Sequence, residues 1–157
     1  MNIQANALEG TWSSFADLSG QHVYDLLRLR QDIFVVEQEC PYSDIDCKDQ
    51  IALHYRLTDR KHEDLAGALR LFLPGAGPDG LCRIGRVVVA KTHRGRGLGR
   101  EMMLAAIAKA GELAAGKPIH LSGQAYLERF YCDLGFETVS EVFLEDGLEH
   151  IDMVRPV

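Results

Sequence analysis

A glycine-rich segment between an apolar run and a helical pattern constrains the fold of this chain more than any other feature. The segment consists of six consecutive residues, Arg94, Gly95, Arg96, Gly97, Leu98 and Gly99. Glycines at alternate positions let the backbone turn tightly and bring several N–H groups to one anion. The helix that follows adds free N-terminal amides and the positive end of its dipole. With the charges of Arg94, Arg96 and Arg100, the segment predicts a site for a pyrophosphate.

Two familiar phosphate-binding patterns differ from this one in their spacing. A P-loop has Lys and then Ser or Thr after its last glycine, whereas Gly99 is followed by Arg100 and Glu101. A Rossmann fingerprint has its third glycine one residue later and normally an acidic residue on the next strand, but the next strand candidate, 119–122, carries no carboxylate. What remains is Arg-x-x-Gly-x-Gly at the start of a helix. The alternative is a glycine-rich connector with solvated arginines.

Composition places the chain among ordinary globular domains. It has 157 residues, 46% hydrophobic and 25% charged, which is enough for one domain with a real core. No apolar run reaches the roughly 18 residues of a membrane span, and the first residues lack the layout of a secretion signal. The four cysteines form no Cys-x-x-Cys pair, so we expect reduced thiols, no metal site and a cytoplasmic location.

The charge balance separates the glycine segment from the rest of the chain. The net charge is -6, which argues against nucleic acid as a main partner. The arginines of the glycine segment therefore form a local basic patch on an acidic protein. This contrast favours a specific small anion as the ligand.

The pattern of apolar residues predicts a mixed sheet with helices on both of its faces, an α/β (α+β) fold. Residues 1–14 are expected to be a lead-in or first edge strand, and 15–157 one domain. Apolar spacing predicts helices at about 20–34, capped by Ser19, at about 98–115 and at about 125–134. It predicts strands at about 54–58, 65–73, 81–90, 119–122, 136–144 and 149–155.

A second motif lies in the C-terminal third. Residues 119–136 read as strand, short turn, helix, glycine cap and strand, and end in Phe130-Tyr131-x-x-x-Gly135-Phe136. Together with the glycine segment, this motif resembles the Gcn5-related N-acetyltransferases, which bind acetyl-coenzyme A (acetyl-CoA). The resemblance implies that Tyr131 lies near the cofactor sulfur and protonates the leaving thiolate as a general acid. The alternative for Tyr131 is an ordinary core aromatic.

Further segments resemble the ElaA-like branch of the same family. They are residues 27–46, 84–89, 124–127 and 141–151. The resemblance implies the acyl-CoA N-acyltransferase fold, whose parallel central strands separate at the cofactor. It also implies that the pantetheine arm pairs with the backbone of Val87 and Val89, and that the N–H of Val88 or Val89 polarises the thioester carbonyl. Gln124 and Phe130 are the further residues expected beside the cofactor.

The implied reaction is direct acetyl transfer from acetyl-CoA to a primary amine of a small molecule or protein, within a ternary complex. The amine must lose a proton before it can attack, so a base is required. Many family members carry a glutamate on the central strand, but this strand has Arg83 and Arg86 instead. The base candidates are Glu37, His54 and His150, since histidine titrates near neutral pH. Glu39, Asp44 and Asp46 are secondary candidates for the base. Each of these residues has a plain structural alternative, a solvated charge or a hydrogen-bonded histidine.

An acidic loop follows the first predicted helix. Tyr42 and the carboxylates at 44–49 are expected to attract a cationic acceptor such as a polyamine or peptide amine, or else to form a solvated loop.

Two other functions remain open. One is a non-catalytic sensor that binds acyl-CoA. The other is an acyltransferase like the acyl-homoserine lactone synthases, whose Arg-x-x-Val/Ile-Phe segment is similar to residues 30–34. No nucleic acid, membrane or metal is expected as a partner, and the chain is expected to be a monomer or homodimer.

Overall fold

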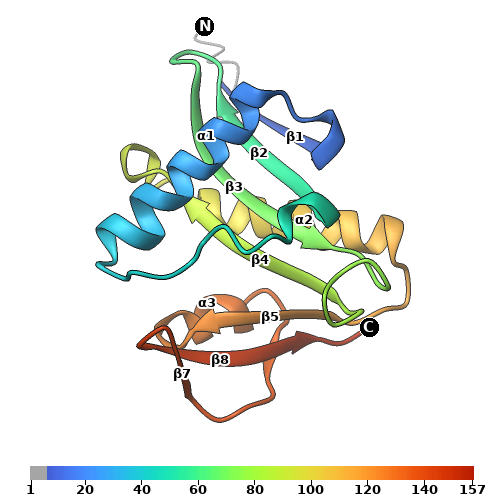
Figure 1. Ribbon diagram of the computed structural model, residues 1–157. Helices are drawn as coiled ribbons and strands as arrows, with labels where there is room; N and C mark the ends of the chain where they lie inside the picture. Colours follow the sequence, from blue (N-terminus) through green and yellow to red (C-terminus); the bar gives the residue numbers. More distant parts are fainter. Residues whose placement is uncertain (1–6) are drawn as a thin grey trace, which may run out of the picture.

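The computed structural model describes residues 7–157, which form one eight-stranded mixed sheet with helices on both faces. The strand order is β1-β2-β3-β4-β5-β8-β6, and β7 pairs with β8 (Figure 1). The strands are β1 (Leu8–Ser14), β2 (Leu53–Asp59), β3 (Asp64–Phe72), β4 (Cys82–Val89), β5 (Ile119–Gln124), β6 (Glu137–Thr138), β7 (Phe143–Glu145) and β8 (Leu148–Arg155). The α-helices are α1 (Gly20–Arg30), α2 (Leu98–Leu113) and α3 (Glu128–Cys132).

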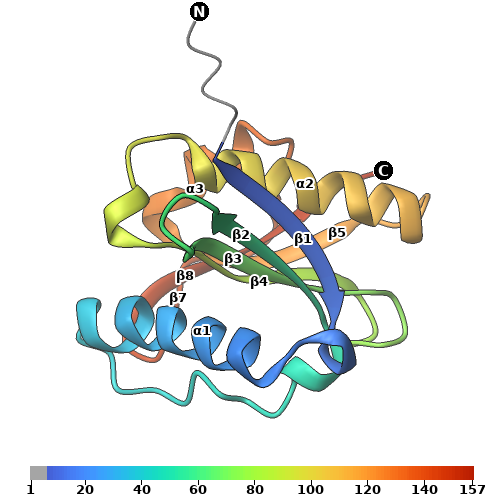
Figure 2. The same cartoon turned by 90° about the horizontal axis from the view of Figure 1, so that it is seen from above.

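The two faces of the sheet are covered by different helices. Helix α1 lies on one face, and α2 and α3 lie on the other (Figure 2). On the first face, Leu26 of α1 packs with Ala68 and Val88. On the second, α2 buries an apolar stripe against the sheet, formed by Leu98, Met102, Met103, Ala106 and Ala110. The predicted mixed sheet with helices on both faces is confirmed.

The first helix begins as predicted but continues further. Ser19 Oγ accepts a hydrogen bond from the N–H of His22 at 3.1 Å, and His22 Nδ1 accepts one from the N–H of Ser19 at 3.2 Å. The predicted end near Phe34 is wrong, because the chain continues as a π-helix over Gln31–Glu37. This run contains three β-branched residues, which lose rotamer freedom in a regular α-helix. The wider turns of the π-helix extend the helical path to Glu37, toward the glycine segment.

Two predicted elements are shorter than expected. The predicted helix at 125–134 is a 3-10 turn, Ala125–Leu127, followed by α3. The predicted strand at 136–144 is interrupted: between β6 and β7, Ser140 Oγ accepts a hydrogen bond from the N–H of Asp152 at 2.9 Å. A side chain thus takes the place of a backbone group at this position, and the backbone pairing with β8 is interrupted between β6 and β7.

The N-terminal segment is an edge strand. Strand β1 pairs antiparallel with β2 along its whole length, from Leu8 opposite Asp59 to Ser14 opposite Leu53. Residues 1–6 of the predicted lead-in lie outside the described residues. None of the helices in the part of the chain that the structure describes is long and apolar enough to cross a membrane.

The centre of the sheet separates between β4 and β5. The two strands are paired in parallel through Cys82 with Ile119 and Arg83 with His120 at their starts, and Figure 1 shows them diverging toward their carboxyl ends. On its other edge, β4 pairs with β3 through a shift in register between Ala68 and Arg70. Arg86 lies in this bulge with a φ of 53°. Beyond the pairs at its start, β4 therefore has a strand on one side and an opening on the other.

Candidate active site

The glycine segment forms the connection from β4 to α2. Gly95 and Gly97 have φ values of 75° and 71°, in the left-handed region that favours glycine. Gly97 is the N-cap of α2, and no atom lies within 4 Å of a Cβ built on either glycine. Leu98 is buried and anchors the segment in the core, so its side chain is not available to a ligand. The space beside Gly95 and Gly97, at the start of α2, is therefore open, and the exposed Arg96 and Arg100 flank it.

Three of the residues expected at the cofactor meet at the carboxyl end of β4. A Cβ built on Gly99 would lie 3.7 Å from Phe130 Cζ and 4.0 Å from Val89 Cγ2. Val87 and Val89 pack toward the core beneath α2, whereas Val88 packs on the other face against α1. The fold thus places the glycine segment, the end of β4 and α3 around one end of the opening between β4 and β5.

Tyr131 lies against β5 at this same end of the sheet. Its Cε2 would be 2.7 Å from a Cβ on Gly123, so the ring packs directly on the backbone one residue before Gln124. The ring centroid is 5.1 Å from that of Phe130 and 6.2 Å from that of Phe136. Burial raises the pKa of Tyr131 to about 12, with a smaller contribution from Tyr126. The hydroxyl is therefore protonated at neutral pH and able to donate.

Glu37 and Arg94, predicted for separate roles, are joined in one ion pair. Arg94 Nη1 and Nη2 donate to the two carboxylate oxygens of Glu37 at 2.5 and 2.6 Å. The hydrogen bonds and charge of Arg94, with the charge of Lys91, lower the pKa of Glu37. An ion-paired carboxylate with a lowered pKa is a weak proton acceptor.

Gln124 and His150 lie opposite each other on β5 and β8. Gln124 Nε2 donates to Oε1 of Gln38 at 3.2 Å, which ties the end of the π-helix to the end of β5. His150 Nδ1 lies 2.8 Å from the carbonyl oxygen of Leu148, and its ring stacks on Phe143 with centroids 6.2 Å apart. The carbonyl accepts from Nδ1–H, and the other ring nitrogen, Nε2, lies 3.5 Å from Glu145 Oε2.

Two loops that are far apart in the sequence are in contact. Cys40 Sγ donates to the carbonyl oxygen of Asp146 at 3.3 Å, which joins the loop after the π-helix to the turn between β7 and β8. Sequence reasoning missed both Gln38 and this contact, because they join segments about 86 and 106 residues apart. No local pattern in the chain signals either one.

His54 lies inside the fold on β2. Its side chain is 2% exposed, and its Nε2 lies 2.8 Å from the carbonyl oxygen of Asp49. Burial lowers its pKa, because the charged imidazolium would lose its hydration. His54 therefore has a structural role, because it links β2 to the acidic loop.

The carboxylates of the acidic loop are buried or half-buried and already paired with arginines, so both expectations for them are wrong. Its carboxylates are ion-paired at 2.5–3.3 Å in a buried network of three aspartates and three arginines, Asp44, Asp46, Asp49, Arg30, Arg70 and Arg86. Tyr42 donates to Asp44 Oδ1 at 2.9 Å. One signal of this network was present in the sequence: Arg70 lies in an apolar run, and a buried arginine requires a partner.

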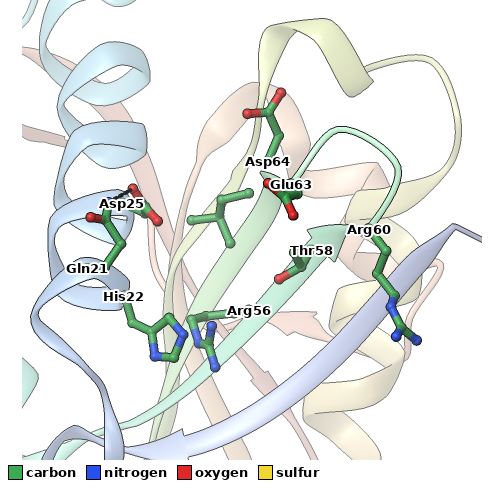
Figure 3. A pocket seen from close by; sticks show the side chains of 9 residues that line it. Gln21, His22, Asp25, Arg56, Thr58, Arg60, Glu63 and Asp64 are labelled. Atoms are coloured by element: carbon green, nitrogen blue, oxygen red, sulfur yellow. Dashed lines mark hydrogen bonds between the residues drawn. The ribbon is translucent and has the colours of Figure 1, made fainter.

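Two hollows lie away from the opening between β4 and β5. One, of about 500 Å³, lies between α1 and the β2–β3 hairpin (Figure 3). Figure 3 shows Asp25 and Asp64 around it together with His22 and Arg56, so both signs of charge line its walls. The other, of about 120 Å³, lies beneath α1 beside His54. Among residues 7–157, no group of three or more His, Cys, Asp or Glu side chains is placed to hold a metal ion.

Comparison with known proteins agrees with this architecture. Residues 34–156 match the model of an acetyltransferase (GNAT) domain. A UPF0039 protein of Mycobacterium tuberculosis is 36% identical over 152 residues, covering 96% of this chain and 93% of the relative. The crystal structure of Escherichia coli ElaA is 36% identical with a TM-score of 0.86, over 94% of this chain and 99% of that one. An acyl-CoA N-acyltransferase from Pseudomonas aeruginosa is 40% identical with a TM-score of 0.88, at the same coverages.

The fold is therefore that of the acyl-CoA N-acyltransferases. Within this class, the chain belongs to the Gcn5-related N-acetyltransferase (GNAT) family, in its ElaA-like branch.

Proposed function

We propose that the protein transfers the acetyl group of acetyl-CoA directly to a primary amine within a ternary complex. One observation carries the proposal: β4 and β5 separate beyond their first residues, and the glycine segment lies at the carboxyl end of this opening. An extended pantetheine arm fits beside β4, where the backbone of Val87 and Val89 lacks a strand partner on the β5 side. The N–H groups at the start of α2 then bind the pyrophosphate.

The reaction requires one proton donor and one proton acceptor. As the amine nitrogen forms its bond to the acetyl carbon, the carbon–sulfur bond breaks and the electron pair leaves on sulfur. The N–H of Val89, which faces the β5 side of β4, stabilises the oxyanion, and Tyr131 donates its proton to the thiolate. Solvent then reprotonates Tyr131.

His150 is our choice as the acceptor of the amine proton. Nδ1 donates to the carbonyl of Leu148, so Nε2 is the nitrogen that takes the proton, and Glu145 Oε2, 3.5 Å from Nε2, stabilises the imidazolium that forms. His150 lies on β8, directly opposite Gln124 at the end of β5. His54 is left out because it is buried and bonded to Asp49, and Glu37 because Arg94 holds its carboxylate.

The test of this function is the release of coenzyme A thiol from acetyl-CoA in the presence of a panel of primary amines. We expect thiol release that depends on the amine, with one acetylated amine formed per thiol. Binding of acetyl-CoA without transfer to any amine would instead indicate a sensor. Release of methylthioadenosine from S-adenosylmethionine would indicate an activity like that of the acyl-homoserine lactone synthases.

Replacing Gly97 by alanine is expected to weaken acetyl-CoA binding roughly tenfold or more, since a Cβ would hold the phosphate away from the backbone N–H groups. The left-handed φ adds a stability cost of about 1 kcal/mol. Gly116→Ala is the matched control, because Gly116 follows the other end of α2 with a φ of 75° and equally open space. Both variants should lose similar stability in thermal melts, and calorimetry should show a binding loss in Gly97→Ala alone. Equal binding by both would remove the glycine segment from the site.

A further inference from the structure

The ion pair between Glu37 and Arg94 links the two sides of the candidate site. Arg94 is the first residue of the glycine segment. Glu37 is the last residue of the π-helix, next to Gln38, which accepts a hydrogen bond from Gln124 opposite His150. The pair is bidentate, at 2.5 and 2.6 Å, with side-chain exposures of 42% for Arg94 and 33% for Glu37. Both groups are thus within reach of a ligand that enters the opening.

The same N–H groups of Arg94 cannot bind two anions at once. The Glu37 carboxylate occupies the pair of Nη groups, which is the edge of the guanidinium that suits bidentate binding of a phosphate. A pyrophosphate bound at the start of α2 carries more negative charge than the carboxylate. A half-exposed ion pair contributes little to stability, so exchange of one anion for the other has a low cost.

We propose that Glu37 and the pyrophosphate of acyl-CoA are alternative partners of Arg94, and that the Glu37 carboxylate, once released, binds a second positive charge on the acceptor. This inference rests on the proposed function. It assigns the acceptor to amines that carry another cationic group besides the one that reacts. Glu37 is then a specificity-determining residue that becomes available when the cofactor is bound.

The surroundings of Glu37 support this role. The nearby carboxylates of the acidic loop are neutralised by Arg30, Arg70 and Arg86, so they leave no charge for an acceptor. Glu37 lies beside Gln38, whose bond to Gln124 places it at the end of β5. The charge of Lys91 also favours the ionised form of Glu37, which keeps the carboxylate negative after Arg94 leaves.

Calorimetry with acetyl-CoA at low ionic strength tests the exchange. We expect Glu37→Gln to bind acetyl-CoA about two- to fivefold more tightly than wild type, because the competitor of the pyrophosphate is gone. The gain should vanish in Glu37→Gln combined with Arg94→Gln. Glu39→Gln is the matched control, an exposed glutamate two residues away whose affinity should equal that of wild type. Thermal melts of each variant check that the fold is retained.

A kinetic comparison tests the acceptor class. We expect Glu37→Gln to raise KM for 1,4-diaminobutane about fivefold or more relative to KM for butylamine, since only the diamine offers a second ammonium group. Binding by wild type together with unchanged or weaker binding by Glu37→Gln would overturn this inference alone. An equal change in KM for both amines would overturn the assigned acceptor class. Absence of acetyl-CoA binding by wild type would overturn the proposed function and this inference with it.

Discussion

Replacement of Tyr131 by phenylalanine is expected to lower kcat for acetyl transfer by about 100-fold, in the range for loss of a positioned proton donor. The affinity for acetyl-CoA and the melting temperature should stay close to those of wild type. The reason is that the ring, not the hydroxyl, makes the contacts with Gly123, Phe130 and Phe136. Phenylalanine keeps those contacts and removes only the group that protonates the thiolate.

Tyr24→Phe is the control for this variant. Tyr24 is 64% exposed and lies on α1, which covers the other face of the sheet from α3, so loss of its hydroxyl should leave kcat unchanged. The measurement is thiol release at saturating acetyl-CoA and amine. The raised pKa of Tyr131, about 12, also predicts that wild-type activity does not fall between about pH 7 and 9.5 through ionisation of this phenol. Full activity in Tyr131→Phe would make Tyr131 a core aromatic and nothing more.

Local chemistry explains why much of the fold could be predicted. The glycines at 95 and 97 adopt the left-handed conformation that their residue type suggested, and Ser19 caps the first helix. The helix that apolar spacing predicted at about 98–115 is α2. Each of these features depends on residues within one or two turns of each other, so the sequence carries the whole signal.

Long-range pairing explains what the sequence could not show. The partner of Glu37 is 57 residues away, and either residue alone reads as a solvated charge. The guanidinium of Arg30, the last residue of α1, is likewise buried between Asp44 and Asp49. Charge pairs of this kind depend on loop conformation, which local propensity does not determine.

Replacement of Asp49 by asparagine is expected to lower the free energy of unfolding by about 3 kcal/mol, at the low end of the range for breaking a buried ion pair. Asp49 Oδ1 accepts from Arg30 Nη1 at 2.8 Å and from Arg70 Nη1 at 3.0 Å. Asparagine has nearly the same shape but no charge, so two buried guanidinium groups lose one of their counterions. The loss stays at the low end because Arg30 keeps Asp44 and Arg70 keeps Asp46.

Urea unfolding of Asp49→Asn and of Asp32→Asn separates the effect of burial from the effect of charge, because each variant removes one aspartate charge. Asp32 forms an exposed pair with Arg28 at 3.9 Å, and its loss should cost less than about 0.5 kcal/mol. Equal losses in the two variants would show that burial adds nothing to the network.

The same network predicts how stability depends on pH. The pKa of Asp49 is lowered, and that of Asp46 is lowered to about 2, because bonds to arginines outweigh the effect of burial. The unfolded chain then binds more protons than the folded one between the ordinary aspartate pKa, about 3.9, and the folded values. The stabilisation is thus complete above about pH 4 and is lost as the pH falls toward 2. Asp49→Asn should show a shallower loss over this window, since one carboxylate with a lowered pKa is gone. An unchanged slope would mean that Asp49 does not contribute to acid sensitivity.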